Sequence, residues 1–466
     1  MAAQPKIPTR ESVTTINTDG SHRILHPADV RGVFTRWRRI AAVVLIGFYT
    51  LLPWIPIGGH PAVFLDVREL QFHFFGLTFA AQDLWLAFFL ISGLGFGLFY
   101  ATALLGRVWC GWACPQTVLL EHVYRRIERF LEGDAQKQRR LDREPWDRNK
   151  LLRRGTKHFL FVLVSLAITH LFLAYFISIP EVWRIMTQTP GQNWGIFVFV
   201  VIATTALYLN FYWFREQLCI VICPYGRLQS ALIDDNSMVI GYDEDRGEPR
   251  GRVGAEGAGD CIACNRCVQV CPTGIDIRQG LQMECIGCAN CVDACDEIMD
   301  KVKRPRGLVR YDSFNGLSGG KTKILRPRII LYTILLLIGA TVMLFSFSRL
   351  KPVSASAFRM QGAPYFVDDR LIRNQYLIRV VNKRSIPMQF TVVPEADASG
   401  LNWSGFEGAV EVGPNSEEVR LFVTTVRRED YTGPFHLVLH VKGEPGGVEI
   451  DRPVEFLGPD PKLLHD

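Results

Sequence analysis

The residues best suited to chemistry in this chain of 466 residues are its twelve cysteines, which form tight groups instead of being scattered. Eight lie between positions 261 and 295, and the other four form two pairs, Cys110 with Cys114 and Cys219 with Cys223. Closely spaced thiolates bind soft metal ions and iron–sulfur clusters. Disulfide frameworks belong to small secreted domains, which this chain does not resemble. The cysteines are therefore predicted to be reduced metal ligands in a cytosolic environment.

The group of eight consists of two runs, each with two, two and three residues between successive cysteines. This is the spacing of bacterial two-cluster ferredoxins, in which three thiolates on a tight loop hold three corners of an iron–sulfur cube. The fourth cysteine of each run serves the other cluster. We therefore predict two 4Fe–4S clusters. The first is held by Cys261, Cys264, Cys267 and Cys295, and the second by Cys285, Cys288, Cys291 and Cys271.

Structural zinc sites are the alternative for this cassette, because close cysteine pairs also bind zinc. A zinc ion needs only four ligands, and a displaced fourth cysteine in each run has no role at such a site. The spacing therefore favours clusters. One position departs from the usual pattern: Pro272 follows the first run, but Asp296 follows the second. This substitution removes no ligand.

The two remaining pairs share the pattern Cys-x-x-x-Cys-Pro, with Pro115 after the first and Pro224 after the second. They lie at equivalent positions of an internal repeat. If a helix continues through each motif, cysteines four apart share one face, and the Pro ends or kinks the helix beside them. The pairs are predicted to converge into a four-sulfur site for Cu(I), zinc or an iron–sulfur species. The alternative is that cysteine is simply a common small residue of membrane helices.

The elements that must position these cysteines are long apolar segments. The chain is 48% hydrophobic and its mean hydropathy is +0.12, which is unusual for a soluble protein of this size. Buried helices of soluble proteins usually keep a polar face, and these segments do not. Each is long enough to cross a bilayer. The five predicted spans are residues 40–57, 84–105, 159–179, 194–214 and 329–347.

Lys and Arg are unevenly distributed among the connections. They are frequent just before the first span, in residues 106–158 and in residues 301–328. The connections 58–83 and 180–193 hold only one each. By the positive-inside rule, the N-terminus, the basic connections and the cysteine cassette are predicted to be cytoplasmic, and the chain after the fifth span is outside. The orientation of the protein in the membrane accounts for the basic loops, so no nucleic-acid partner is expected.

The last part of the chain contains no cysteine and has the pattern of β structure. Residues 376–381, 418–426 and 435–441 are rich in β-branched and aromatic side chains, and Asn, Gly and Pro clusters separate them. Several short strands in about 100 residues fit an immunoglobulin-like sandwich.

The expected fold is a multi-pass α-helical membrane protein with an inserted ferredoxin-like two-cluster 4Fe–4S domain and a C-terminal all-β immunoglobulin-like sandwich. Five parts are expected: a cytoplasmic tail (1–39), a four-span membrane domain with both Cys-x-x-x-Cys-Pro motifs (40–230), a cytoplasmic ferredoxin-like domain (231–310), a basic linker with the fifth transmembrane helix (311–348), and a periplasmic immunoglobulin-like domain (349–466).

The order of these parts resembles the cytochrome c oxidase accessory proteins of the CcoG family, also called FixG or RdxA. The resemblance implies assembly of the cbb-type oxidase at the inner membrane of a bacterium, and reduction of Cu(II) to Cu(I) before copper delivery. It makes the four cysteines of the two Cys-x-x-x-Cys-Pro motifs catalytic, copper-handling thiols that the cassette supplies with electrons. Copper is then a substrate or transient ligand. The implied partners are copper-delivery proteins and oxidase subunits.

Two other function classes stay open. Related membrane ferredoxins of the nitrate and nitrous oxide pathways move electrons from quinol toward periplasmic reductases. Here such a route would be free of b-type haem, because only His170 lies within a span. The third class is a non-catalytic assembly scaffold that docks through the β domain. No dinucleotide fingerprint is present, so the electron donor is either a cytoplasmic carrier or a quinol. His122 is a candidate additional ligand.

Overall fold

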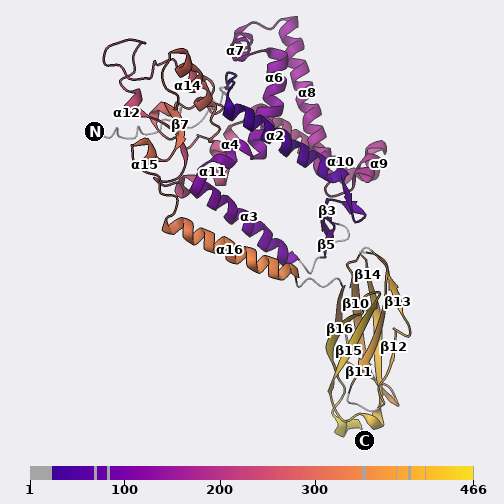
Figure 1. Cartoon of the computed structure of the whole chain (residues 1–466). Coiled ribbons are helices and arrows are strands. Elements are labelled where there is room, and N and C mark those ends of the chain that lie inside the picture. The colour runs from indigo at the N-terminus through magenta and orange to yellow at the C-terminus, as the bar shows by residue number, and fades with distance from the viewer. Residues whose placement is uncertain are drawn as a thin grey trace. The chain divides into compact units, whose positions relative to one another are not determined.

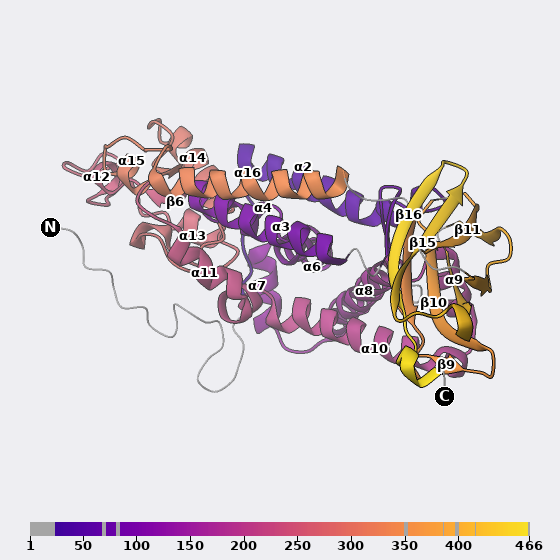
Figure 2. The same cartoon turned by 90° about the horizontal axis from the view of Figure 1, so that it is seen from below.

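The computed structural model describes residues 24–67, 71–80, 84–348, 353–384, 386–396, 400–414 and 416–464. Contacts divide the chain into two compact units, shown in two views in Figures 1 and 2. The first unit comprises Met1–Ile55 and Ala87–Met343, and the second comprises Pro56–Leu86 and Leu344–Asp466. All twelve cysteines belong to the first unit.

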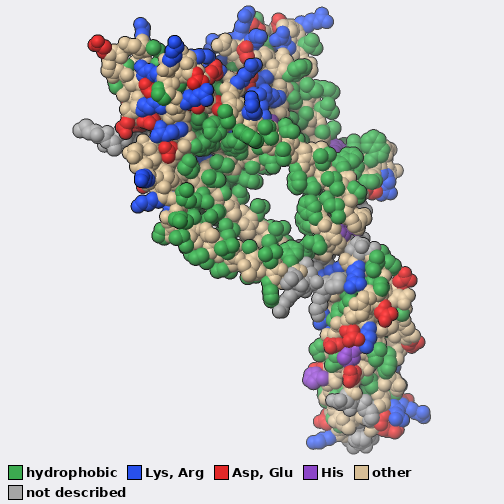
Figure 3. Space-filling view, in the orientation of Figure 1, with side chains coloured by type: hydrophobic (Ala, Val, Ile, Leu, Met, Phe, Trp, Pro, Cys, Tyr) green, Lys and Arg blue, Asp and Glu red, His purple; other side chains and the backbone are tan. Residues whose placement is uncertain are grey.

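Four helices in the described residues are long and apolar enough to cross a membrane, so this is a multi-pass membrane protein. Their apolar side chains form the broad hydrophobic surface of the first unit in Figure 3. Lys and Arg gather instead around the cassette and the helices next to it. The four helices are α3 (Leu84–Leu105), α8 (Arg148–Leu173), α10 (Trp194–Leu209) with a π-helical extension (Asn210–Phe214), and α16 (Pro327–Ser348).

The first predicted span, 40–57, is not among these four. The helix found there, α2, runs over Val33–Leu51 and is followed by a 3₁₀ turn at Leu52–Trp54. It therefore begins earlier than predicted and takes in three arginines, which make it too polar to meet the same criterion. The third predicted span, 159–179, also differs. Its helix ends at Leu173, and a separate helix, α9 (Ile179–Thr187), follows after a turn.

Short helices connect the second and third predicted spans. Their core is aromatic: the Tyr124 ring stacks on Phe211 at a centroid distance of 4.2 Å and meets Phe161 edge-on at 4.9 Å. This packing holds the connection against α8 and the end of α10. The connecting elements are α4 (Val108–Trp112), α5 (Pro115–Leu119), a π-helical segment (Leu120–Tyr124), α6 (Arg125–Glu132) and α7 (Ala135–Arg143).

The cysteine cassette lies between two antiparallel strands, β6 (Val239–Tyr242) and β7 (Val309–Asp312). Its buried core includes Ile240, Val292 and Met299 together with cassette cysteines. The helices of this region are α11 (Pro224–Leu232), α12 (Glu244–Gly247), α13 (Arg266–Gln269), α14 (Asn290–Lys301) and α15 (Phe314–Leu317).

The second unit contains the β domain, and the predicted strands are confirmed there as parts of β10, β14 and β15. One sheet has the order β12-β14-β10-β8, with β9 also on β10, and the other has the order β13-β11-β15-β16. Alternating inward side chains, such as Tyr376, Phe390 and Phe422, fill the space between the sheets. The strands are β8 (Val353–Arg359), β9 (Phe366–Val367), β10 (Leu371–Asn382), β11 (Met388–Glu395), β12 (Asn402–Ser404), β13 (Val410–Val412), β14 (Glu417–Arg427), β15 (Phe435–Glu444) and β16 (Val448–Phe456).

The other part of this unit, near residues 56–80, is a small β region. It consists of a two-stranded pair, β1 with β2, and a three-stranded sheet of order β3-β4-β5. His60 and His73 stack face to face at a centroid distance of 3.9 Å, and His73 is buried. The strands are β1 (Pro56–Ile57), β2 (His60–Pro61), β3 (Val63–Asp66), β4 (Gln71–Phe74) and β5 (Leu77–Ala80).

Candidate electron-transfer site

The two cassette loops have the same backbone conformation. Ala263 and Asn265 flank Cys264 with φ of 53° and 57°, and Gly287 and Ala289 flank Cys288 with φ of 67° and 59°. Left-handed backbone costs a non-glycine residue roughly 1–2 kcal/mol. Such strain collects at ligand sites. The same conformation in both loops indicates that each is shaped to bind the same kind of ligand.

Two cavities lie within the cassette, and each gathers one of the predicted ligand sets. The first cavity is lined by Cys261, Cys264, Cys267 and Cys295. The second is lined by Cys271, Cys285, Cys288 and Cys291, with Cys267 on its border. Each set thus combines three cysteines of one run with the displaced fourth cysteine of the other, as predicted for two cubane clusters.

The composition of the two cavities favours clusters over zinc. A zinc ion needs only four ligands and has no use for a fourth cysteine displaced into the other run, and each cavity contains such a cysteine. The assignment of individual ligands stays a prediction.

Burial strongly affects the cassette thiols. It raises the pKa of Cys288 to about 11 and that of Cys285 and Cys295 to about 12. Unligated thiols here remain protonated at neutral pH, so loading of the clusters releases protons. The two sets differ in exposure at one thiol, because Cys264 is exposed whereas no cysteine of the second set is. The first set is therefore the one closer to solvent.

The two Cys-x-x-x-Cys-Pro motifs end in the same way, and in neither does one helix continue through the motif. Cys110 lies in α4 and Cys219 in a π-helical segment (Leu218–Ile222), but the helix stops before the second cysteine of each motif. Cys114 has φ −61° and ψ 125°, and Cys223 has φ −64° and ψ 112°. Each following Pro is the first residue of a new helix, where its missing N–H has no consequence.

The structure brings the two pairs together. Burial, together with the nearby Cys114, Cys110 and Cys223, raises the pKa of Cys219 to about 12. Burial likewise raises the pKa of Cys110 to about 11. The Cys110 thiol donates to Oε1 of the fully buried Gln229 at 3.4 Å, which links the first motif to α11 behind the second. These four cysteines form what we call the membrane-edge site.

The membrane-edge site lies directly against the second ligand set. A Cβ on Gly111, between Cys110 and Cys114, would lie 2.7 Å from Ile286 O and 2.9 Å from both N and Cα of Cys288. Only glycine allows so close an approach of the two backbones. The motif and the cassette loop are therefore in van der Waals contact, and the cysteines form one continuous series from the first set to the membrane edge.

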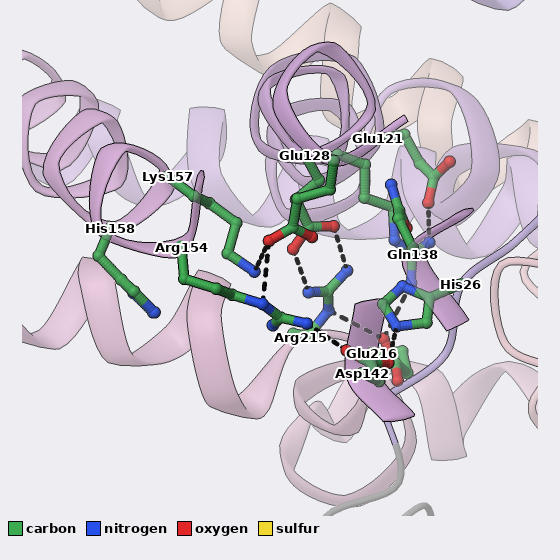
Figure 4. A network of polar contacts seen from close by, with 12 residues as sticks. His26, Glu121, Glu128, Gln138, Asp142, Arg154, Lys157, His158, Arg215 and Glu216 are labelled. Carbon is green, nitrogen blue, oxygen red and sulfur yellow. Dashed lines mark hydrogen bonds and ion pairs between the residues drawn. The ribbon is translucent and has the colours of Figure 1, made fainter. Parts of the chain in front are cut away.

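A buried network of ion pairs supports this arrangement, and the sequence did not indicate it. Arg215 Nη1 and Nη2 donate to the two carboxylate oxygens of Glu128 at 2.8 and 3.0 Å (Figure 4). The Arg215 charge holds the pKa of Glu128 near 2, although burial alone would raise it. Arg125 pairs with Glu121 and, at 3.1 Å, with Glu216. Removing one partner of such a pair costs about 3–5 kcal/mol.

The N-terminal segment from residue 24 onward is the second feature that the sequence did not indicate. It was expected to be a tail, yet its described part lies on the cassette. The Ala28 N–H donates to Gln269 O at 2.8 Å, and His26 Nε2 lies 2.8 Å from an Asp142 carboxylate oxygen. The Asp293 carboxylate accepts from the Thr35 N–H and hydroxyl, both at 2.7 Å.

His122 is half-buried, and it joins no metal-binding group in the described part of the chain. Burial, with help from Arg38, lowers its pKa to about 4.

Apolar crossing helices, a cassette with two cysteine-lined cavities and a β sandwich define a membrane-bound iron–sulfur protein. Comparison with protein-family models agrees. A "4Fe-4S dicluster domain" matches residues 214–314 and a "4Fe-4S binding domain" matches residues 85–132. A model described as "IG-like fold at C-terminal of FixG, putative oxidoreductase" matches residues 343–459.

The chain belongs to the FixG/RdxA family. It is 34% identical over 461 residues to the nitrogen fixation protein FixG of Rhizobium meliloti, covering 86% of each chain. It is 36% identical over 428 residues to protein RdxA of Cereibacter sphaeroides, covering 87% of this chain and 90% of the relative. A crystal structure of a FixG-related protein from Vibrio parahaemolyticus matches 23% of this chain and 97% of that one, at 14% identity and a TM-score of 0.22.

Proposed function

We propose that this membrane iron–sulfur oxidoreductase reduces Cu(II) to Cu(I) at the membrane-edge site for maturation of the cbb-type cytochrome c oxidase. The observation that supports the proposal most is the contact of Gly111 with the backbone of Cys288, because it joins an electron-carrying cassette to a group of four thiols. Thiolates favour Cu(I) over Cu(II), so the same groups that bind the ion also favour its reduced form.

The residues divide the work between electron transfer and metal binding. When bound, 4Fe–4S clusters supply one-electron transfer. Cys261, Cys264, Cys267 and Cys295 would hold the cluster nearest solvent, where a cytoplasmic carrier would deliver one electron, and the second set would hold the cluster beside the membrane-edge site. A quinol is the other candidate donor. At the membrane-edge site, Cu(II) accepts that electron and becomes Cu(I), with no other bond made or broken. Cys110 and Cys219 are half-buried, so water has limited access to these two thiols.

The orientation in the inner membrane belongs to the same proposal. The basic connections next to the cassette favour a cytoplasmic position for the first unit's polar end, and the β domain then lies in the periplasm. There it is available to copper-delivery proteins and oxidase subunits, which are the partners we propose.

The test is anaerobic reduction of Cu(II) by purified, pre-reduced protein, measured with a Cu(I)-specific chelator. A variant with Ser at Cys110, Cys114, Cys219 and Cys223 should reduce copper no faster than the buffer control while keeping the iron of both cassette clusters. The matched control is the wild-type protein adjusted to the same iron content.

Equal rates for the two proteins would show that the cassette reacts with copper non-specifically, and the copper proposal would then be rejected. Quinol-dependent reduction of the cassette, measured in the same membranes, would in that case favour an electron carrier that feeds a respiratory reductase.

A further inference from the structure

Three buried arginines from outside the cassette connect its second ligand set to the membrane-edge site. Arg38 comes from α2, Arg107 precedes α4 and Arg125 begins α6. Each donates both to a residue at or next to a cysteine of the second set and to a residue in or close to a Cys-x-x-x-Cys-Pro motif. The first set has no such connection among the described residues.

The contacts of Arg38 and Arg107 show this bridging. Arg38 Nη1 donates to Asn290 Oδ1 at 2.7 Å, next to Cys291, and its Nε donates to Gly111 O at 2.9 Å. Arg107 Nη1 donates to Cys285 O at 3.3 Å, and its Nη2 donates to Gly226 O at 2.8 Å, in the helix that follows Cys223. Each guanidinium therefore spans the contact between the second ligand set and the membrane-edge site, which we call the junction.

Arg125 bridges the same junction, but carboxylates pair with its charge. Its Nη2 donates to Pro272 O at 3.2 Å, beside Cys271, and lies 3.1 Å from Glu216, three residues before Cys219. Glu121 and Glu216 compensate its charge. We therefore expect Arg125 to position the two sites and to contribute little net charge.

Arg38 and Arg107 lack this compensation. Their acceptors are neutral, and in the described residues neither of them forms an ion pair. Their relative exposures are 3% and 9%, and the Arg38 Nη2 nitrogen has no hydrogen-bond partner in the described structure. Glu121, whose pKa Arg125 and Arg38 lower against the effect of burial, is already paired with Arg125. Buried charge without a counter-charge is unfavourable, and an anionic group in the second cavity would supply one.

The arginines around the first set are paired with carboxylates or, like Arg266, only half-buried. Arg278 pairs with Asp276 at 2.7 Å, and Arg246 and Arg304 both pair with Asp260 at 2.5 Å. Asp296 adds a half-buried carboxyl directly after Cys295. The two cavities therefore differ in electrostatic environment although their loops have the same conformation.

We infer that Arg38 and Arg107 are positioning residues that raise the reduction potential of the second cluster above that of the first and so give the electron its direction. The reason is electrostatic: each reduction adds one negative charge, and two uncompensated cations in a low-dielectric junction favour that charge. One electron leaves the reduced first centre, which is oxidised, and enters the second, which is reduced. The inference uses the two-cluster relay of the proposed function but not its copper step.

The experiment is an anaerobic redox titration of the purified full-length protein with dithionite, followed by electron paramagnetic resonance, with iron and sulfide content measured in parallel. The variants are Arg38→Gln, Arg107→Gln and their Arg→Lys counterparts. Both Gln variants should lower the same one of the two midpoint potentials and leave the other nearly unchanged. The Lys variants, which keep the charge, should stay close to wild type.

Two controls identify the affected centre. Arg252→Gln removes an exposed arginine of the loop before the cassette, whose charge water screens, and should move neither midpoint. Asp296→Asn removes the carboxylate beside Cys295 and should raise the midpoint that the arginine variants leave unchanged. If both midpoints stay at wild-type values in fully loaded Gln variants, or if Lys shifts them as much as Gln does, the inference is wrong. Because copper is absent, failure of the copper proposal would not affect this result.

Discussion

Gly111 is the residue on which the contact between membrane and cassette depends most directly. A methyl group there would collide with backbone atoms of Ile286 and Cys288, which no side-chain rotation can relieve. Gly111→Ala should therefore push the first motif away from the second ligand set. We expect a loss of about 1–3 kcal/mol of stability, typical of overpacking, and markedly slower Cu(II) reduction at unchanged iron content.

The measurement is the chelator assay, with thermal unfolding followed on the same samples. The matched control is Gly155→Ala in α8, where a Cβ meets nothing within 4 Å and should behave like wild type. A Gly111→Ala protein with full copper-reduction rate would show that electron transfer does not use this contact.

At the residue scale, sequence reasoning succeeded where the signal is local. Within each run the cassette cysteines lie two or three residues apart, and this spacing, with the two-cluster ferredoxin pattern, predicted the ligand sets. The same cysteines line the two cavities, and their role as ligands stays a prediction. Arg38 could not be found in this way, because its acceptors Gly111 and Asn290 are 73 and 252 positions away in the chain. Arg38 lies in a run of arginines just before a predicted span. Such a run is explained by membrane orientation alone, so it did not indicate a contact with the cassette.

At the scale of elements, α2 begins where another part of the chain caps it. Its own N-cap, Gly32, has no side chain to bond the first N–H groups. Asp293 of α14 does so instead, accepting from Phe34 N at 3.2 Å and Thr35 N at 2.7 Å, with its charge at the positive end of the helix. This explains why the helix begins before the predicted residue 40.

Asp293→Ala should detach the start of α2 from the cassette, because it leaves these buried N–H groups without an acceptor. The expected loss is about 1–3 kcal/mol. Limited trypsin digestion should then cut at Arg31 or Arg36 faster than in wild type. Asp293→Asn keeps an acceptor and should give an intermediate rate. Equal digestion of all three proteins would mean that the cap does not hold this segment.

We also predict that α2 crosses the membrane, although it does not meet the criterion of the other four helices. Residues before it contact the cassette, and α3 ends on that same side, where Gly111 meets Cys288. If α3 crosses the bilayer, its first residues lie on the side of the membrane opposite the cassette. The chain must therefore cross the bilayer once between Arg39 and Leu86. The arginines of α2 lie in its first turns: Arg36 and Arg39 are exposed, where they would meet water or headgroups, and Arg38 is buried against the cassette.

An epitope inserted at the Gly58–Gly59 turn tests this prediction, since a short exposed turn tolerates insertion. Antibody should reach it in intact spheroplasts, whereas an N-terminal epitope should require permeabilisation. If both epitopes required permeabilisation, α2 would lie on the membrane surface.

The sequence left open whether the helices continue through the Cys-x-x-x-Cys-Pro motifs, and in the structure each helix ends before the second cysteine. Apolar composition does not reveal a helix end inside the headgroup region. Proline is equally compatible with stopping one helix and starting another. The β domain was easier to predict, because alternation along β10, β14 and β15 records burial on one face of each sheet.

At the scale of the whole molecule, the chemistry and the β domain are in separate units. All twelve cysteines and the arginines that join them belong to the first unit, and the sandwich has its own closed core. Sequence composition already suggested this division, since cysteine disappears after position 295. The arrangement assigns electron transfer to one unit and leaves the other available for partners.

A chain that ends after Phe347 should therefore keep both cassette clusters and reduce Cu(II) at the wild-type rate in the chelator assay, because it retains every cysteine and all three arginine bridges. In cells it should fail to support maturation of the cbb-type oxidase, since the β domain, through which we propose that partners dock, is missing. The matched control is full-length protein with the four membrane-edge cysteines changed to Ser, which should fail in both assays. If the truncated chain matures the oxidase normally, the β domain is not the docking unit. If it loses iron or copper reduction, the two units are not functionally separate, and electron transfer depends on contacts beyond the first unit.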